Sequence, residues 1–148
     1  MRAILVSLLL GIFTMSSHAA TVERYTDPAM QDANLPFSQS VRVGNMLYLS
    51  GQIGNIPGTL DLAPGGMEGQ ASQTMDNIEA ILEANGASFA DVTKCLVMLA
   101  DMSQWADFNK IYVTYFEPGQ FPARSAFGAN GLALGGALEV ECEAYLGD

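Results

Sequence analysis

Histidine is almost absent from this sequence of 148 residues, which contains a single copy, His18. His18 lies within the first 20 residues, which are expected to be cleaved off as described below. A mature chain without histidine cannot carry a Ser-His-Asp triad, a Cys-His dyad or a histidine-ligated metal site. Cysteine is nearly as rare, and two residues, Cys95 and Cys142, are too few for a structural zinc site. We therefore expect no metal site.

Basic residues are also scarce. Six Lys and Arg stand against 16 Asp and Glu, which gives a net charge of -10. Affinity for nucleic acid comes largely from basic side chains that neutralise phosphates, so this composition argues against a nucleic-acid partner. The same charge keeps a protein soluble and repels anionic membrane surfaces.

The first 20 residues have the pattern of a cleaved signal peptide. Arg2 precedes an apolar run over residues 4–13, and the small residues of Ser17-His18-Ala19-Ala20 suit a signal peptidase. A membrane anchor is the alternative, but the run is shorter than the ~20 residues of a spanning helix. We expect cleavage before Ala20 or Thr21, a periplasmic or secreted protein and no stable membrane association. Loss of Arg2 without any acidic residue would take the net charge to -11.

The two cysteines allow two interpretations. Both lie in apolar, strand-like stretches, where a free cysteine commonly packs as a small buried hydrophobe. A disulfide is the alternative in an exported protein. We favour free thiols, because strand geometry rarely brings two such Cβ atoms within bonding range.

Residues 21–35 show no periodicity and are expected to form a loosely ordered lead-in, followed by one domain over residues 36–148. Val41 and Val43, the turn residues Gly44-Asn45 and the stretch 46–53 predict a β-hairpin. Residues 54–66 are rich in glycine and proline and predict a loop.

Two helices and three further strands are expected after this loop. Apolar residues at three- and four-residue steps predict the first helix, which Gly86 ends: Met67, Ala71, Met75, Ile78 and Leu82. The second helix has Ser103 as N-cap, ends at Pro118-Gly119 and carries aromatic residues expected in the core: Trp105, Phe108, Tyr112 and Tyr115. Strands are expected over residues 89–99, 124–129 and 137–146.

The last strand alternates apolar residues with Glu139, Glu141 and Glu143, so that one face is apolar and the other carries carboxylates. The order β-β-α-β-α-β-β predicts an α+β fold. Two helices should pack on one face of a mixed, mostly antiparallel sheet, which leaves the other face for solvent or a partner subunit.

Several short motifs resemble the RidA (YjgF) family in order and spacing: Pro36-Phe37-Ser38-Gln39, Gly44-Asn45, Leu49-Ser50-Gly51-Gln52-Ile53, Phe108-Asn109-Lys110-Ile111-Tyr112, Pro122-Ala123-Arg124-Ser125 and Leu138-Glu139-Val140-Glu141. The resemblance implies a chorismate-mutase-like homotrimer with clefts between subunits. It also implies hydrolysis of reactive 2-imino or 2-enamino acids, such as 2-iminobutanoate, to 2-keto acids and ammonia, without a metal or organic cofactor.

By this resemblance, Arg124 grips the substrate carboxylate, for which a planar guanidinium provides two parallel hydrogen bonds. Glu139 is the matching carboxylate that positions and deprotonates water, with Glu141 a weaker second candidate. The alternative for Arg124 is an exposed ion pair, and the alternative for Glu139 is an ordinary acidic residue on the surface.

The resemblance assigns supporting substrate contacts to Ser50, Gly51 and Asn109. Phe37 and Ala126 are also expected at the substrate-binding site, but both depart from the family. Phe37 stands where active members usually carry tyrosine, and Ala126 where many carry cysteine or another small residue. A lost phenol costs on the order of 1 kcal/mol of binding. A non-catalytic trimer that binds small carboxylates is therefore the alternative function. Ribonuclease activity, attached to some relatives by name, is disfavoured by the acidic charge.

Overall fold

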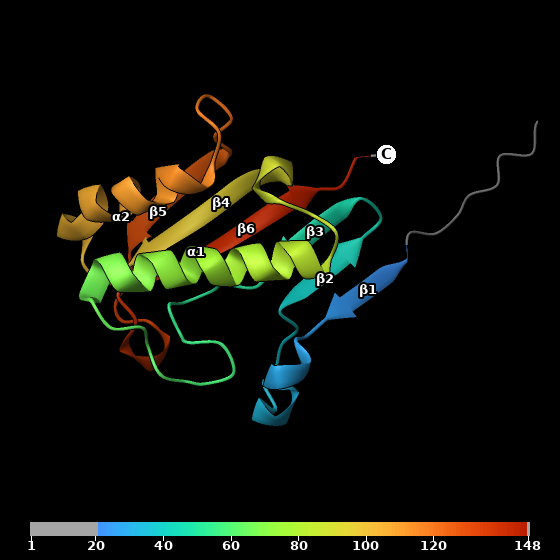
Figure 1. Cartoon of the computed structure of the whole chain (residues 1–148), viewed down its shortest axis with the longest axis horizontal. Helices are drawn as coiled ribbons and strands as arrows, with labels where there is room; N and C mark the ends of the chain where they lie inside the picture. Colours follow the sequence, from blue (N-terminus) through green and yellow to red (C-terminus); the bar gives the residue numbers. More distant parts are fainter. Residues whose placement is uncertain (1–20, 148) are drawn as a thin grey trace, which may run out of the picture.

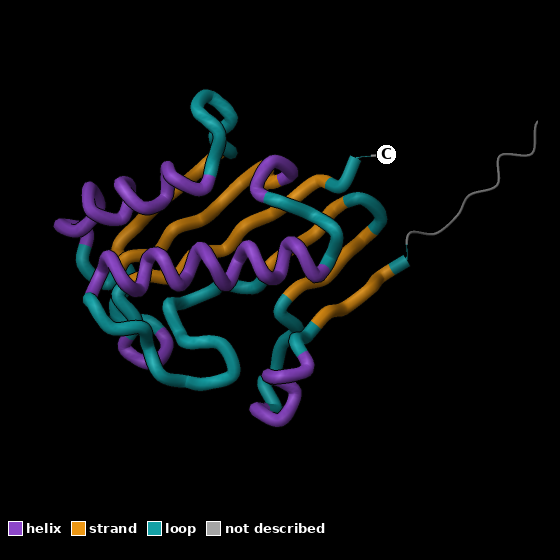
Figure 2. Tube along the Cα trace, in the orientation of Figure 1, coloured by secondary structure: helices purple, strands orange, loops and turns teal. Residues whose placement is uncertain are grey.

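The computed structural model describes residues 21–147, apart from the side chains of residues 32 and 33. It contains a six-stranded sheet in the order β1-β2-β3-β6-β4-β5, and both α-helices cover the same face of it (Figures 1 and 2). Neighbouring strands are antiparallel except β4 and β5, which are parallel. The predicted α+β class and the placement of both helices on one face are confirmed.

The segment 21–35 is more ordered than predicted. Strand β1 (Val22–Tyr25) pairs antiparallel with β2 (Ser40–Val43), and the 3-10 helix η1 (Pro28–Ala33) follows. β1 is an edge strand whose side chains are mostly exposed, so no apolar alternation marks it in the sequence. Its order comes from the strand pairing, and residues 21–147 contain one strand more than predicted.

The hairpin is confirmed, with β2 joined to β3 (Met46–Leu49) through Gly44, whose φ of 59° suits glycine. β3 ends four residues earlier than the predicted strand. The chain nevertheless stays beside β6, because Gln52 and Val140 exchange two backbone hydrogen bonds of 2.9 Å. This short bridge fixes the position of Gly51.

Helix α1 (Gly66–Ala84) forms as predicted, and all five of its predicted core residues are buried. Helix α2 (Trp105–Tyr112) is shorter than predicted. Ser103 is not its N-cap: Asp101 accepts a hydrogen bond from the Ser103 amide and caps a preceding 3-10 turn, Met102–Gln104. After Tyr112 the chain tightens into a second 3-10 turn.

The remaining strands are β4 (Val92–Leu99), β5 (Ala123–Gly128) and β6 (Leu138–Tyr145). Along β6 the buried residues alternate with the glutamates, as predicted. β4 begins three residues later than predicted, because Phe89–Asp91 form a 3-10 turn closed by a capping box from Ser88.

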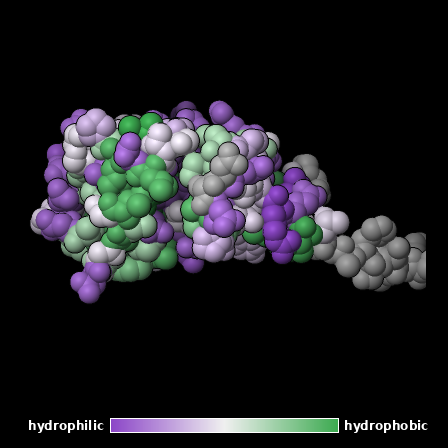
Figure 3. Space-filling view, turned by 90° about the horizontal axis from the view of Figure 1, so that it is seen from below, coloured by the Kyte–Doolittle hydropathy of each residue, from purple (hydrophilic) through white to green (hydrophobic). Residues whose placement is uncertain are grey.

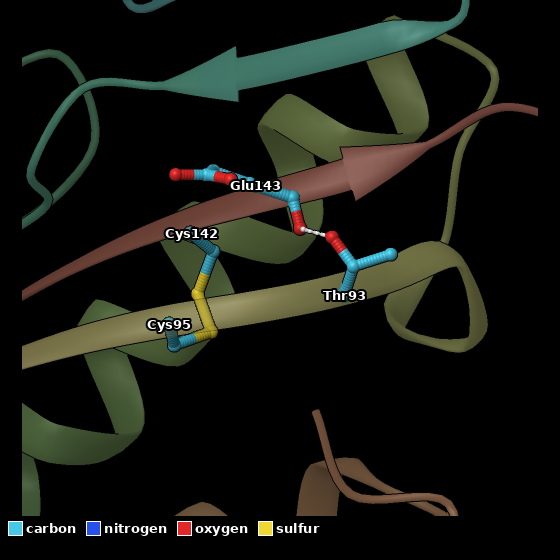
Figure 4. Close-up of a disulfide and its surroundings, with 4 residues drawn as sticks. All are labelled: Thr93, Cys95, Cys142 and Glu143. Atoms are coloured by element: carbon cyan, nitrogen blue, oxygen red, sulfur yellow. Dashed lines mark hydrogen bonds between the residues drawn. A yellow bond between two sulfur atoms is a disulfide. The ribbon is translucent and has the colours of Figure 1, made fainter. Parts of the chain in front are cut away.

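Cys95 and Cys142 form a disulfide, so the expectation of free thiols is wrong. The two residues are direct partners in the antiparallel pair of β4 and β6, and their Cα atoms lie 4.1 Å apart (Figure 4). Both are fully buried on the helix-covered face. The cross-strand register brings the two side chains together, and no local sequence pattern contains that register.

No helix within residues 21–147 is long and apolar enough to span a membrane.

Candidate functional site

A cavity of about 410 Å³ is the first candidate site. Its walls come from β1 and η1, the loop after β3, helix α1 and the 3-10 helix η5 (Ala133–Gly135). Seen from below, hydrophobic side chains gather on the side of the molecule that carries this loop and η5 (Figure 3). Three predicted site residues line the cavity: Phe37, Gly51 and Glu139.

Glu139 contributes a carboxylate to the cavity wall. It lies on β6 between buried Leu138 and Val140, so its side chain points away from the face that the helices cover. Partial burial raises the pKa of Glu139, and the charge of Glu141 raises it further. Within residues 21–147 we find no hydrogen bond to this carboxylate. It is therefore placed to accept a proton from a bound molecule.

Gly51 provides the room that this carboxylate occupies. A Cβ atom at position 51 would overlap Oε1 of Glu139, so any larger residue would push the carboxylate aside. The backbone on either side is fixed, by the Ser50 amide on the Gln39 carbonyl at 2.9 Å and by the bridge between Gln52 and Val140. Gly51 therefore belongs to the site through its lack of a side chain.

Ser50 does not line the cavity. Its hydroxyl donates a hydrogen bond of 2.7 Å to the Ser38 carbonyl, which ties the segment after β3 to the segment before β2. Its role within one chain is structural. Phe37, by contrast, lines the cavity with its ring half exposed.

Arg124 lies elsewhere, on β5 and beneath α2. Its guanidinium stacks on three aromatic rings at centroid distances of 4.4 to 5.9 Å: Tyr112, Trp105 and Phe108. Such stacking holds a planar cation in place without neutralising it. Its Nη1 atom is buried without a hydrogen-bond partner in the described part of the chain.

Helix α2 carries two further unpaired groups, on Asn109 and on Tyr112, and the ring of Tyr112 stacks on Arg124. Asn109 Oδ1 and the Tyr112 hydroxyl are both buried without partners among residues 21–147, and both side chains belong to α2. Burial raises the pKa of Tyr112 to about 12, although the nearby charge of Arg124 lowers it, so the phenol keeps its proton at neutral pH. Ala126, two residues after Arg124 on β5, packs partly buried against the core. We call Arg124, Asn109 and Tyr112 the arginine cluster.

One chain does not bring Arg124 and Glu139 together. Arg124 pairs with Cys95, which pairs with Cys142, so its side chain shares the helix-covered face with the disulfide. Glu139 points to the opposite face, two strands away and three residues along β6. The predicted catalytic pair is therefore divided between two places on the molecule.

The sequence did not single out the aromatic side chains that hold Arg124. Trp105, Phe108 and Tyr112 were expected in the core on the strength of their helical spacing, and Phe108 and Tyr112 are buried there. Their contact with Arg124 depends on how α2 lies across β5, which no local pattern contains. The apolar cavity residues of the loop and η5 carry no recognisable signal either.

No group of three or more His, Cys, Asp and Glu side chains is placed to hold a metal ion within residues 21–147.

Comparison with known proteins identifies the class of molecule. A model of the Endoribonuclease L-PSP family matches residues 28–146. RidA from an Antarctic Psychrobacter has a solved structure that superposes with a TM-score of 0.71, at 41% identity over 75% of this chain and 89% of that one. Yeast Mmf1 superposes with a TM-score of 0.77, at 30% identity over 86% and 100% of the two chains. The chain belongs to the Endoribonuclease L-PSP family, which includes RidA, and the predicted family and fold are confirmed.

Similar sequences come from several kingdoms. A mouse protein named 2-iminobutanoate/2-iminopropanoate deaminase is 42% identical over 112 residues, 76% of this chain and 82% of its own length. The human protein of the same name is 40% identical over 112 residues, 76% and 81% of the two chains. The chain is thus related to imine deaminases over most of its length.

The prediction of a signal peptide and a periplasmic location is not supported by these comparisons and is corrected. Relatives occur in mouse and human, whose cells have no periplasm, and an Arabidopsis relative is named chloroplastic. The family match begins only at residue 28, and residues 1–20 lie outside the described part of the chain.

Proposed function

We propose that the protein hydrolyses reactive 2-imino and 2-enamino acids to 2-keto acids and ammonia. The observation that carries the proposal is the Glu139 carboxylate, which lines the cavity beside Gly51 with a raised pKa and no hydrogen-bond partner among the described residues. The curated relatives named as imine deaminases support the reaction class.

The reaction needs one proton acceptor and one carboxylate anchor. Glu139 takes a proton from a water molecule as its oxygen attacks C2 of the imine, and returns that proton to the nitrogen. This gives a carbinolamine, with a hydroxyl and an amino group on C2. Glu139 then passes the hydroxyl proton to the amino nitrogen, the C2–N bond breaks, NH3 leaves, and a C2 carbonyl remains. Because the substrate carries a carboxylate, it also needs a cationic partner, and Arg124 is suited to a two-pronged contact.

Since Arg124 and Glu139 lie on opposite faces of the sheet, we propose that two copies of the chain share each site. The cavity with Glu139 from one subunit would face the arginine cluster of the next. A contact between two different surfaces repeats around a ring, which fits a closed homotrimer.

The open face of the sheet, opposite the helices, fits such an assembly. It carries Tyr48, Leu96 and Met98, and each of them is the cross-strand partner of a glutamate of β6. A partner subunit on this face would remove apolar area from water. Light scattering should report three times the mass of one chain, and a stable monomer would contradict the shared site.

A non-catalytic protein that binds small carboxylates through the same site is the second candidate. Phe37 favours it, because the ring at the cavity lacks the hydroxyl that active members of the family usually carry. The family's printed name, endoribonuclease, has less support here, because a net charge of -10 repels the phosphates of RNA.

The test is an imine-trapping assay. An amino-acid oxidase generates 2-iminopropanoate or 2-iminobutanoate, semicarbazide traps it, and the purified protein should suppress formation of the semicarbazone. Glu139→Gln should not suppress it. If the parent protein binds 2-ketobutanoate but leaves trapping unchanged, the binding function is correct and the deaminase proposal fails.

A further inference from the structure

The cavity beside Glu139 is larger than the smallest imino acids require. At about 410 Å³ it has the volume of about 14 water molecules in the liquid. The relatives' named substrate 2-iminobutanoate has only about seven non-hydrogen atoms, with two carbons in its side chain, and ligand sites normally enclose most of their ligand. Space remains for a longer side chain.

The walls of this space are mainly apolar. Residues from four segments of the chain contribute hydrophobic side chains: Met30, Leu35, Phe37, Ile53, Leu60 and Leu134. Leu60 and Leu134 are more than half exposed, at 57% and 52%, so an apolar ligand would remove them from water.

Two amide side chains in the walls, those of Asn77 and Gln52, are already engaged with the protein's own backbone. The Asn77 amide donates to the carbonyls of Ile53 and Asn55 at 3.0 and 2.9 Å. The Gln52 amide donates to the carbonyls of Ser50 and Gly51 at 2.9 and 3.2 Å. These bonds fix the loop that forms the wall, and they turn its amide donors away from a ligand.

We propose that the preferred substrates are 2-imino acids with a branched aliphatic or aromatic side chain, and that this side chain lies in the cavity. The inference rests on the proposed deaminase function, because Glu139 at the wall defines where C2 of the substrate lies. From that point the apolar walls continue into the cavity. The phenylalanine at position 37 belongs to the same wall, where its ring packs against a side chain instead of donating a hydrogen bond.

The experiment compares imines made by an amino-acid oxidase from alanine, 2-aminobutanoate, leucine and phenylalanine, with kcat/KM from the trapping assay. Each buried methylene contributes about 0.8 kcal/mol, so the leucine imine should exceed 2-iminobutanoate by about tenfold. Hydrolysis of all four imines at equal rates, or a preference for the smallest, overturns the inference and leaves the deaminase function intact. Hydrolysis of none overturns both.

A matched pair of variants locates the side chain. Ala80 and Ala84 lie one turn apart on α1 and are both exposed, but only Ala80 lines the cavity. Ala80→Leu should lower kcat/KM for the leucine and phenylalanine imines about tenfold more than kcat/KM for 2-iminopropanoate. Ala84→Leu should change neither. Equal losses on large and small imines with Ala80→Leu would place the substrate side chain outside the cavity.

Discussion

At the scale of single residues, the position of Glu139 predicts which glutamate of β6 carries the chemistry. Glu139→Gln keeps the shape of the side chain but cannot accept a proton, so turnover should fall by about 10²- to 10⁴-fold while 2-ketobutanoate still binds. Glu141→Gln is the matched control, because Glu141 lies on the same face of the strand but does not line the cavity. A dead Glu141→Gln with an active Glu139→Gln would move the assignment by two residues.

The raised pKa of Glu139 has a consequence for stability as well as for rate. The folded protein holds this proton more tightly than the unfolded chain, so the stabilising contribution is present at low pH and is lost as pH rises through the raised pKa. Glu139→Gln stays neutral throughout. Its free energy of unfolding relative to the parent should therefore increase between about pH 4 and about pH 7, measured by urea unfolding. A difference that does not change with pH would contradict the raised pKa.

We expect substitution of Gly51 to lower the activity while the protein still folds. In Gly51→Ala the new methyl group would displace the flexible end of Glu139, so kcat should fall at least about tenfold while stability changes by less than about 1 kcal/mol. Gly147→Ala is the control, because a Cβ atom there meets only an ordinary contact with Tyr145. Activity and thermal unfolding of both variants provide the measurement, and an active Gly51→Ala would show that the carboxylate need not lie where it does.

At the scale of elements, most of the fold could be predicted from local pattern. The hairpin, helix α1 and the amphipathic strand β6 follow from turn residues and apolar spacing, and the structure confirms them. Features that depend on distant partners could not be predicted: the edge strand β1, the early end of β3 and the pairing of Cys95 with Cys142. The same is true of the site: the motifs identified Arg124 and Glu139, but they could not predict that the two residues lie on opposite faces of the sheet.

We expect the disulfide to contribute measurably to the free energy of unfolding. It joins β4 to β6 and closes a loop with a sequence separation of 47 residues. The chain-entropy relation for a loop of this length gives about 4 kcal/mol. Replacing both cysteines with alanine should lower the free energy of unfolding by about 2 to 4 kcal/mol, measured at fixed protein concentration by urea unfolding. An unchanged midpoint would mean that the strand pairing alone holds this part of the sheet.

At the scale of the whole molecule, the division of the site predicts complementation between inactive variants. Arg124→Ala and Glu139→Gln should each be inactive alone. When the two are co-expressed, some interfaces combine an intact Arg124 from one subunit with an intact Glu139 from the next. With random assembly of a cyclic oligomer, about a quarter of the sites should be active.

The trapping assay on the co-purified mixture measures this recovery. The double variant Arg124→Ala/Glu139→Gln, co-expressed with either single variant, is the control, because no arrangement of those subunits contains both intact residues at one site. Activity of the mixture at the level of this control would show that both residues act from the same chain.

The disulfide also determines whether the two fragments of a proteolytically cleaved chain stay joined. Residues 117–121 form an exposed turn between α2 and β5, the orange loop that projects from the molecule in Figure 1. This turn lies between Cys95 and Cys142 in the sequence, so a single cut in it leaves both fragments covalently joined. After brief digestion with a protease of broad specificity, a denaturing gel without reductant should show one band at the original mass, and dithiothreitol should release two fragments. A nicked molecule would then keep Arg124 attached to the sheet that positions it.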